Sequence, residues 1–280
     1  MSNPSHLPDA LNGLEDLRAF KYTNGPVTHK VYVAGSGPGV LLMHELPGMT
    51  PECIEVARLI SSKGFTVYLP LFFGEPGQRS GKFDDIKAIT HLCVHHEFNL
   101  LHKNGHSKIT DWLRALCGKM NEETGGNGVG VIGMCLTGSI VLSVMLHPAV
   151  RVPVMCQPAI PFQLLPGHAE SESLGVPRDD LDKAKQKALI TPIMGFRFNT
   201  DIICRAERFN TLRAEFGSSF EGVEIETGKG NPGNIPNEEH SVLCGYYPGF
   251  DIHDENHPSR HALDAILSRF KRDLSASWRG

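Results

Sequence analysis

The chain has 280 residues, of which 40% are hydrophobic, and a formal net charge of −4. Because the two signs are interspersed, this balance argues against a nucleic-acid-binding or anionic-membrane surface. The seven cysteines include no CxxC pair, and no segment reads as a signal peptide or a membrane span. We therefore expect a cytoplasmic, soluble globular protein with reduced thiols, which binds neither nucleic acid nor membrane.

Residues 1–24 are polar and weakly patterned, which predicts a loose N-terminal extension with a short helical piece. Residues 25–280 follow without a linker long enough for a second domain, so we expect one domain there. The apolar patterning in the first half of this domain predicts three strands and one helix. The expected elements are strands at Val27–Ala34, Val40–Met43 and Phe65–Leu69, and a helix at Pro51–Lys63. The order strand, helix, strand implies a parallel pair with a right-handed crossover.

After a charged, His-rich excursion at 74–106, the second half continues the alternation of strands and helices. The expected helices are Ser107–Met120, Ile140–Leu146, Asp179–Lys187, Arg205–Phe216 and Pro258–Leu274. The expected strands are Val129–Ile132, Val152–Cys156, Leu189–Phe196 and Val223–Thr227. This alternation predicts an α/β protein with a mostly parallel, twisted sheet covered by helices on both faces.

One stretch joins a buried strand to a very apolar helix through Gly133-Met-Cys-Leu-Thr-Gly138. A sharp strand-to-helix turn with a nucleophile at its tip is the geometry of a nucleophile elbow. The turn lifts Cys135 above the sheet, and the dipole of the following helix favours its thiolate. Taken alone, a single cysteine is more often a buried, inert packing residue.

Functional residues of open parallel sheets lie at the carboxyl ends of the strands. Three further residues meet that condition here: Glu45 after an early strand, Asp201 after the penultimate strand, and His240 in the loop after the last one. The chain order of nucleophile, acid and histidine is that of α/β-hydrolases. Together with Cys135 they form a more specific pattern than any one of them.

The chain resembles the dienelactone hydrolase family (carboxymethylenebutenolidase-like) of the α/β-hydrolase superfamily. Two passages carry the resemblance, Val40-Leu-Leu-Met-His-Glu-Leu-Pro-Gly48 and the cysteine elbow, and it extends from about Gly25 to the C-terminal helix. It implies a Cys–His–Asp triad that hydrolyses a cyclic ester or a related carboxylic ester. One departure is Thr137, where the family usually has Gly, so we expect looser packing or a shifted neighbour there.

The roles follow from the chemistry of acyl transfer. Cys135 would attack the ester carbonyl, His240 would move the proton, and Asp201 would orient the imidazole. The backbone N–H groups of Leu46 and Leu136 would receive the oxyanion. Glu45 occupies the position of a family carboxylate that interacts with the resting cysteine; the alternative is that Glu45 only caps the strand end.

The choice of histidine is open at this stage. His253 follows a Pro-Gly turn, as in many hydrolases, but His240 comes sooner after the last strand and is followed by Ser, as in the family. Asp251 and Asp254 are alternatives to Asp201, although only Asp201 follows the penultimate strand. We favour His240 and Asp201.

Other charged groups are less specific. Family members that cleave dienelactone bind the substrate carboxylate through arginines, for which Arg79, Arg197 and Arg205 are candidates here, but none lies in a specific motif and we expect each to be a surface residue. The segment His91-Leu-Cys-Val-His-His96 does not present its histidines on one side with a carboxylate, so we expect no metal. No phosphate-binding glycine loop follows a strand, so we expect no cofactor.

We therefore expect a cofactor-independent hydrolase of a lactone or small carboxylic ester that forms a thioester acyl-enzyme, as a monomer or homodimer. Two alternatives remain: a thiol hydrolase of thioesters or small amides, and a non-catalytic binding or regulatory protein on the same scaffold.

Overall fold

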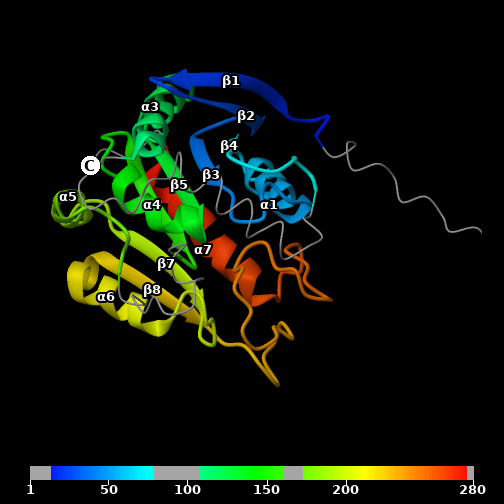
Figure 1. Ribbon diagram of the computed structural model, residues 1–280. Helices are drawn as coiled ribbons and strands as arrows, with labels where there is room; N and C mark the ends of the chain where they lie inside the picture. Colours follow the sequence, from blue (N-terminus) through cyan, green and yellow to red (C-terminus); the bar gives the residue numbers. More distant parts are fainter. Residues whose placement is uncertain (1–13, 79–106, 160–172, 276–280) are drawn as a thin grey trace, which may run out of the picture.

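The computed structural model describes residues 14–78, 107–159 and 173–275. The described strands form a single sheet in the order β1-β2-β4-β3-β5-β6-β7-β8 (Figure 1). The strands are β1 (Arg18–Asn24), β2 (Val27–Gly35), β3 (Gly39–Met43), β4 (Thr66–Leu71), β5 (Val129–Met134), β6 (Val150–Cys156), β7 (Ile193–Phe198) and β8 (Phe220–Ile225). The helices are α1 (Pro51–Ser62), α3 (Lys108–Glu123), α4 (Leu136–Val144), α5 (Arg178–Ala188), α6 (Ala206–Phe216) with the 3-10 turn η3 (Gly217–Ser219), and α7 (Pro258–Asp273).

The sheet is mostly parallel, as predicted. β2 runs antiparallel to its two neighbours, β1 and β4, whereas the pairs from β4 across to β8 are parallel. The carboxyl ends of β3, β5, β6 and β7 therefore meet at one edge. Chain segments that are far apart in the sequence come together there.

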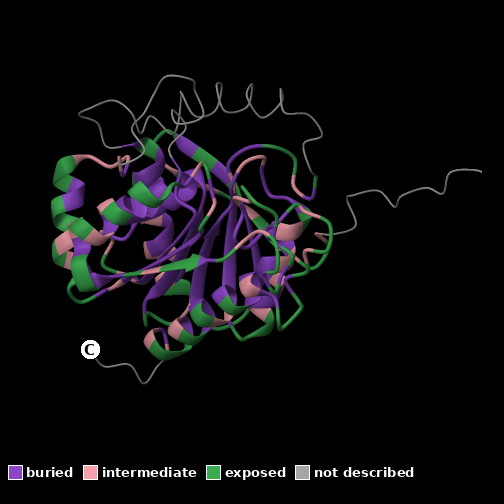
Figure 2. Ribbon diagram, turned by 90° about the horizontal axis from the view of Figure 1, so that it is seen from below, coloured by how far each residue is buried: buried purple, intermediate pink, exposed green. Residues whose placement is uncertain are grey.

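Helices cover both faces of the sheet and divide its core in two. Helices α1 and α7 pack on one face, and α3, α4, α5 and α6 pack on the other. Strand β3 shows the division, because Leu41 and Met43 point to one core and Val40 and Leu42 to the other. Figure 2 shows the strands as a buried layer between helices whose outer sides are exposed. The predicted α/β-hydrolase architecture is confirmed.

Helix α1 illustrates how local sequence sets the elements that shape the site. Thr50 caps its N-terminus by accepting a hydrogen bond from the N–H of Cys53 at 3.3 Å, and Pro51 stands in the first turn. Gly64 follows its end with φ of 91°, a conformation that glycine adopts at little cost. The crossover therefore delivers the chain from β3 to β4 as the sequence predicts.

The N-terminal extension is shorter than predicted, because Arg18–Asn24 is a strand of the sheet. It pairs antiparallel with β2, from Arg18 opposite Val33 to Asn24 opposite Val27. As an edge strand it is exposed or half-buried along its length, so its hydrophobic alternation is faint. Its pairing with β2 and a hydrogen bond of 3.1 Å from Trp112 Nε1 to the carbonyl of Tyr22 hold it in place. The expected domain start at residue 25 falls inside this hairpin.

Three element boundaries also differ from the prediction. The penultimate strand begins at Ile193, since Leu189 and Ile190 lie outside it and are 70% and 75% exposed. The last strand is Phe220–Ile225, at the edge of the sheet, where exposure of Val223 weakens the apolar pattern. Helix α4 begins four residues before the predicted Ile140, directly after the candidate nucleophile. Most of the predicted excursion at 74–106, from residue 79 onward, and most of the crossing segment at 158–177 lie outside the described residues.

Candidate active site

The candidate nucleophile stands at a sharp turn between β5 and α4. Cys135 has φ of 54° and ψ of −120°, which is a rare conformation for a residue other than glycine. Its N–H donates to the carbonyl of Cys156 at 3.1 Å, and its carbonyl accepts from the N–H of Ala159 at 2.9 Å. A Cβ at Gly138 would lie 2.9 Å from the carbonyl oxygen of Cys156, so only glycine lets α4 pass this close to β6. The local geometry is that of a nucleophile elbow.

Thr137 tightens this turn, and the looser packing predicted for it is wrong. Its side chain is fully buried, and its hydroxyl accepts a hydrogen bond from the N–H of Met134 at 2.9 Å. The same hydroxyl lies 2.9 Å from the carbonyl oxygen of Met43, at the end of β3. The threonine thus joins the elbow to the neighbouring strand through these hydrogen bonds, which a glycine could not make.

Glu45 lies two residues beyond β3, and only 2% of it is exposed. One carboxyl oxygen accepts from Gln157 Nε2 at 3.0 Å, and the other is hydrogen-bonded to Ser241 Oγ. Burial raises the pKa of Glu45 to about 7, against the opposing effects of the His240 charge and of these two hydrogen bonds. Glu45 can therefore take up or release a proton near neutrality.

A second buried histidine, which we did not single out from the sequence, fixes the backbone of Glu45. The N–H of Phe72 donates to His44 Nε2 at 3.1 Å, so Nε2 carries no proton. Nδ1 is then the donor to the carbonyl of Glu45, at 3.0 Å. Burial lowers the pKa of His44 to about 4, which keeps the ring neutral. His44 is a structural support for the strand end.

Asp201 and His240 form a hydrogen-bonded pair although they come from different loops. Asp201 follows β7, and its Oδ1 accepts from the N–H groups of Ile203 and Cys204 at 2.8 and 2.9 Å. Its Oδ2 lies 2.7 Å from His240 Nδ1. The carboxylate is thus fixed by the backbone on one side and by the imidazole on the other.

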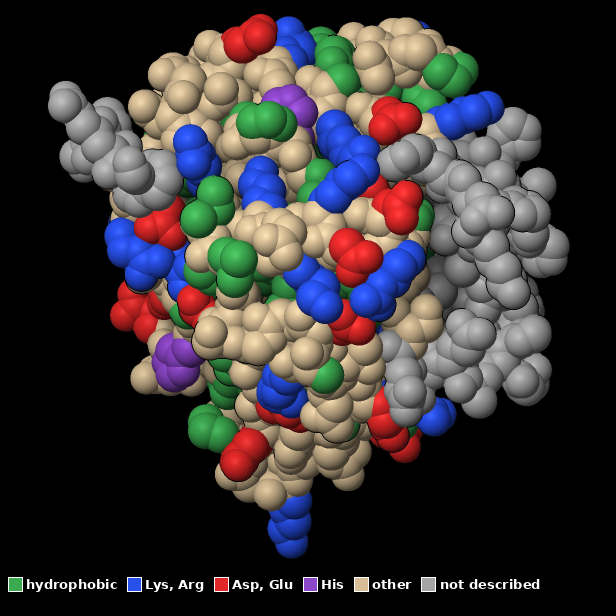
Figure 3. Space-filling view, turned by 90° about the vertical axis from the view of Figure 1, so that its left-hand side faces the viewer, with side chains coloured by type: hydrophobic (Ala, Val, Ile, Leu, Met, Phe, Trp, Pro, Cys, Tyr) green, Lys and Arg blue, Asp and Glu red, His purple; other side chains and the backbone are tan. Residues whose placement is uncertain are grey.

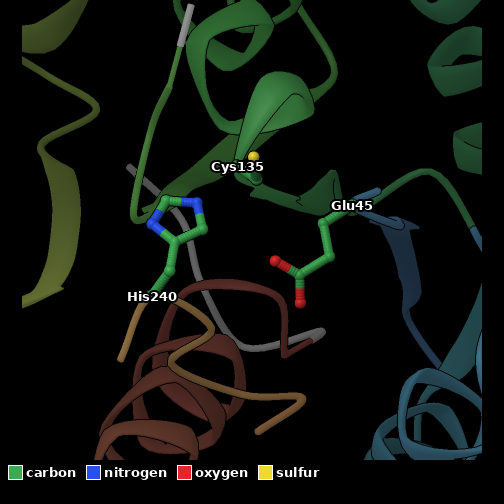
Figure 4. Close-up of side chains that lie close together, drawn as sticks. All are labelled: Glu45, Cys135 and His240. Carbon is green, nitrogen blue, oxygen red and sulfur yellow. The ribbon is translucent and has the colours of Figure 1, made fainter. Parts of the chain in front are cut away.

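The other ring nitrogen of His240 faces the elbow. His240 Nε2 is buried and has no hydrogen-bond partner within the described residues. Donor atoms of His240, Cys135 and Glu45 all lie within 4.8 Å of one another, and Figure 4 shows the three side chains around one space. Burial by itself would lower the pKa of His240, but the charges of Cys135 and Asp201 raise it well above its usual value. The imidazole is therefore more basic than an ordinary histidine and is close to the sulfur at the elbow.

The structure places the alternative residues elsewhere. His253 is 53% exposed in its side chain, and its Nε2 lies 3.4 Å from Glu55 on α1. Asp251 accepts from the N–H of His253 at 2.8 Å, and Asp254 from that of Asn256 at 2.9 Å, so both carboxylates shape their own loop. The backbone groups assigned to the oxyanion belong to Leu46, directly after Glu45, and to Leu136, the first residue of α4.

Two of the three candidate arginines have structural roles, and the third, Arg79, lies outside the described residues. Arg197 is 1% exposed, donates to the carbonyls of Cys204 and Asn199 at 2.8 and 3.2 Å, and pairs with Glu224. Arg205 is exposed and donates to the carbonyl of Ile202 at 3.1 Å. All three guanidinium nitrogens of Arg197 are thus engaged within the protein, and Arg205 bonds its own loop through Nε.

An arginine that we did not consider from the sequence is buried without a partner. Arg208, in the first turn of α6, is 1% exposed, and none of its three guanidinium nitrogens has a hydrogen-bond partner in the part of the chain that the structure describes. Burial lowers its pKa, while the charges of Cys204, Cys135 and Asp201 act in the opposite direction. The sequence offered one sign of this burial, because Arg208 lies on the same helix face as Leu212 and Phe216, four and eight residues later.

The surface that Figure 3 shows carries charges of both signs. On the face in Figure 3, basic and acidic side chains are interspersed over the described residues. A membrane-spanning helix is not found among residues 14–78, 107–159 and 173–275, where every helix is too short or too polar. The His-rich segment 91–96 lies outside these ranges.

Comparisons with known proteins place this chain among hydrolases. The model of the dienelactone hydrolase family matches residues 27–227, whereas no curated protein matches significantly. An assigned dienelactone hydrolase from Klebsiella pneumoniae subsp. pneumoniae MGH 78578 has 16% identity and a TM-score of 0.60, covering 94% of this chain and 99% of that one.

Two proteins from metagenomic libraries have the same fold. The dienelactone hydrolase-like promiscuous phosphotriesterase P91 has 15% identity and a TM-score of 0.61, with 92% and 98% of the two chains covered. A cold-adapted esterase from an Arctic intertidal library has 16% identity and a TM-score of 0.57, with 92% and 94% covered. The fold and the family match, over more than half of its length, together show that this chain belongs to the dienelactone hydrolase family of carboxylic ester hydrolases.

Proposed function

We propose that the protein hydrolyses a lactone or small carboxylic ester through Cys135, His240 and Asp201, without a cofactor. The observation that carries this proposal is the position of the His240 ring. Nδ1 lies 2.7 Å from the Asp201 carboxylate, and Nε2, which has no other hydrogen-bond partner among the described residues, faces the sulfur at the elbow. A general base needs an orienting partner on one side and the nucleophile on the other.

In acylation, His240 Nε2 accepts the Cys135 proton, and the sulfur forms a bond to the ester carbonyl carbon. The carbonyl electron pair moves onto oxygen, where the N–H groups of Leu46 and Leu136 receive it. When the tetrahedral intermediate collapses, the carbon–oxygen ester bond breaks, and the imidazolium returns its proton to the leaving alkoxide. The product of this half-reaction is a thioester on Cys135; for a lactone, the alcohol stays attached to the acyl group.

In deacylation, His240 takes a proton from water as the water oxygen attacks the thioester carbonyl. The carbon–sulfur bond breaks, the imidazolium returns its proton to the Cys135 sulfur, and the carboxylic acid product leaves. Asp201 stabilises the imidazolium in both halves and holds it in the required tautomer. Because the acid product ionises in water, one proton is released per turnover.

Glu45 is proposed to interact with the sulfur in the resting enzyme. Its carboxyl group is one of the three within 4.8 Å, and its pKa of about 7 makes it an acid or a base near neutrality. The thiol proton itself passes to His240, so the proposed role of Glu45 is to hold the resting sulfur until substrate displaces this contact. The strand-end capping role is less favoured, because both carboxyl oxygens are bonded to side chains from other loops, Gln157 and Ser241.

Arg208 is the proposed partner of a carboxylate on the substrate. A buried guanidinium whose three nitrogens have no hydrogen-bond partner among the described residues is costly, and a substrate anion would satisfy it with a bidentate pair. Its electrostatic interaction with Cys135 places it in the neighbourhood of the reacting sulfur. Arg208 thus takes the place of the arginines suggested by the sequence.

The test is turnover of p-nitrophenyl acetate and of a small lactone by wild type and Cys135→Ala. We expect the wild type to release p-nitrophenolate and, when quenched, to carry one acetyl group on Cys135. Full activity in Cys135→Ala would refute the mechanism. Turnover of thioesters or amides in preference to esters would favour the alternative thiol hydrolase, and no turnover at all would favour a binding protein.

A further inference from the structure

Glu45, Cys135 and His240 bring together three kinds of metal-binding atom. A carboxylate oxygen, a sulfur and an imidazole nitrogen lie within 4.8 Å of one another, and Figure 4 shows them facing a shared space. It is the one such group among the residues that the structure describes. We propose that this group binds a thiophilic divalent cation, with Zn²⁺ as the best fit, and that the bound cation reversibly blocks the nucleophile.

His240 is already arranged as a metal ligand. Its Nδ1 is engaged by Asp201 at 2.7 Å, which leaves the buried, unpartnered Nε2 as the donor. A carboxylate that holds the far nitrogen of a ligating imidazole is the usual outer support of a zinc-bound histidine. The same contact that orients the general base therefore orients a ligand.

Glu45 and Cys135 are also held by their surroundings. Hydrogen bonds from Gln157 and Ser241 orient the carboxylate, and the elbow fixes the sulfur at the start of α4. Both residues are more than nine-tenths buried. A cation bound in this space would therefore contact three side chains that the fold already holds in place, so little conformational entropy would be lost on binding.

The spacing of the three atoms is close to that of a zinc site. Bonds to zinc of about 2.0 Å to nitrogen and oxygen and about 2.3 Å to sulfur put tetrahedral ligand atoms about 3.5 Å apart. The observed separations are at most 4.8 Å, so closure needs a contraction on the order of 1 Å. Rotation about the side-chain bonds of Glu45 and His240 can supply it, and the fourth position would take water.

The local charges also favour a cation. With His240 neutral and Glu45 and Cys135 deprotonated, as metal ligation requires, the carboxylates of Glu45 and Asp201 and the sulfur carry three negative charges, which the positive charge of Arg208 offsets only in part. A divalent cation would neutralise the remaining negative charge. The sulfur and nitrogen donors select Zn²⁺ over Mg²⁺ or Ca²⁺, which require oxygen ligands.

Binding would stop acyl transfer without a covalent change. The sulfur electron pair that attacks the ester would be donated to the metal, and His240 Nε2 could no longer accept a proton. The thiol proton and any proton on the imidazole would be released to solvent on binding. A chelator would reverse the block.

The experiment measures metal binding to the metal-free protein by competition with a chromophoric chelator. We expect one Zn²⁺ per chain, no competition from Mg²⁺, and loss of ester turnover that EDTA restores. Co²⁺ in place of Zn²⁺ should produce a thiolate-to-cobalt charge-transfer band, which reports sulfur ligation directly. Circular dichroism would show that each variant is folded.

Variants separate this site from adventitious binding. Cys135→Ser should abolish the charge-transfer band and weaken Zn²⁺ binding, Glu45→Gln should weaken it by removing a ligand, and Asp201→Asn should weaken it by about 10–100-fold. The matched control is His253→Ala, which removes an exposed histidine paired with Glu55 and should leave binding unchanged. Unchanged affinity in Cys135→Ser or Glu45→Gln, or a cobalt complex without the band, would overturn the proposal.

The binding measurement does not depend on the proposed function. If Zn²⁺ binds as described but the metal-free protein hydrolyses no ester, the proposed function fails and this inference stands. If esters are hydrolysed and Zn²⁺ neither binds nor inhibits, the inference alone fails.

Discussion

Nδ1 of His240 lies 2.7 Å from Oδ2 of Asp201, although the two residues are 39 positions apart in the chain. The contact places the proton of the neutral ring on Nδ1 and leaves Nε2 as the basic nitrogen. It also explains why burial does not make His240 less basic, because the nearby negative charges outweigh the loss of hydration. The same pair therefore sets both the orientation and the basicity of the ring.

The first prediction concerns this pair. Asp201→Asn keeps the size of the side chain but removes its charge and favours the wrong tautomer of His240. We expect kcat/KM for a p-nitrophenyl ester to fall by roughly 10²–10⁴-fold, while the far-ultraviolet circular dichroism spectrum is retained. Asp251→Asn, in the loop of His253, is the matched control. Equal losses in the two variants would contradict the assignment of Asp201.

Much of the fold could be predicted from the sequence, because buried parallel strands are continuous apolar runs and helices have a clear apolar face. The run Val129–Ile132 followed by Gly133 and Gly138 predicts the elbow that the structure contains. The edge strand β1 could not be predicted from the sequence. β1 carries charged and half-buried residues, and only its pairing with β2 and the contact with Trp112 make it a strand.

Some residues of the candidate site could be predicted from the sequence and others could not. Position after a strand was enough to select Glu45, Asp201 and Cys135, because the carboxyl ends of parallel strands meet at one edge. Sequence could not show that Arg208 is buried without a partner, since its exposure depends on how α6 packs. It also could not show that the Thr137 hydroxyl would reach the end of β3.

The second prediction follows from the raised pKa of Glu45. Between pH 4.5 and 7 the folded protein holds a proton on Glu45 that the unfolded chain has lost, so stability falls as pH rises through this window. The effect is fully developed above pH 7, where it amounts to about 3 kcal/mol at most. Glu45→Gln should therefore be stabilised relative to wild type at pH 8 and much less at pH 4.5. Urea denaturation at the two pH values measures this, and an equal difference at both would contradict it.

The third prediction concerns thiol reactivity. Burial raises the pKa of Cys117 to about 12 and also raises those of Cys156 and Cys204, and all three side chains have no exposed surface. Cys135 is 8% exposed and lies beside the His240 imidazole. Iodoacetamide near neutral pH should therefore label Cys135 well before these three, as peptide mass spectrometry would show. Comparable labelling of Cys204 would argue against an activated sulfur.

The fourth prediction tests the link between the elbow and β3. Thr137→Val keeps the shape of the side chain but leaves the N–H of Met134 without its acceptor, so we expect a loss of about 1–3 kcal/mol in unfolding free energy. Thr137→Ser retains the hydroxyl and should recover most of that loss. Urea denaturation compares the three proteins. If valine is as stable as threonine, the hydroxyl does not hold the elbow.

The fifth prediction concerns the cost of the unpaired Arg208. Replacing it by Met fills a similar volume and removes a buried charge that has no partner within residues 14–78, 107–159 and 173–275, so we expect Arg208→Met to be as stable as wild type or more stable, by about 1–4 kcal/mol. If Arg208 binds a substrate carboxylate, the same variant should raise KM for a carboxylate-bearing ester but not for its uncharged methyl ester.

Arg197 is the matched control for this prediction, because it is equally buried but fully engaged. It donates to the carbonyls of Cys204 and Asn199 and pairs with Glu224, so Arg197→Met leaves these acceptors unsatisfied and should destabilise the protein. Opposite signs for the two variants in urea denaturation would show that Arg208 is retained at the expense of stability. A loss of stability in Arg208→Met as large as that in Arg197→Met would instead make Arg208 a structural residue, since a guanidinium kept only for a ligand contributes nothing favourable to the unliganded fold.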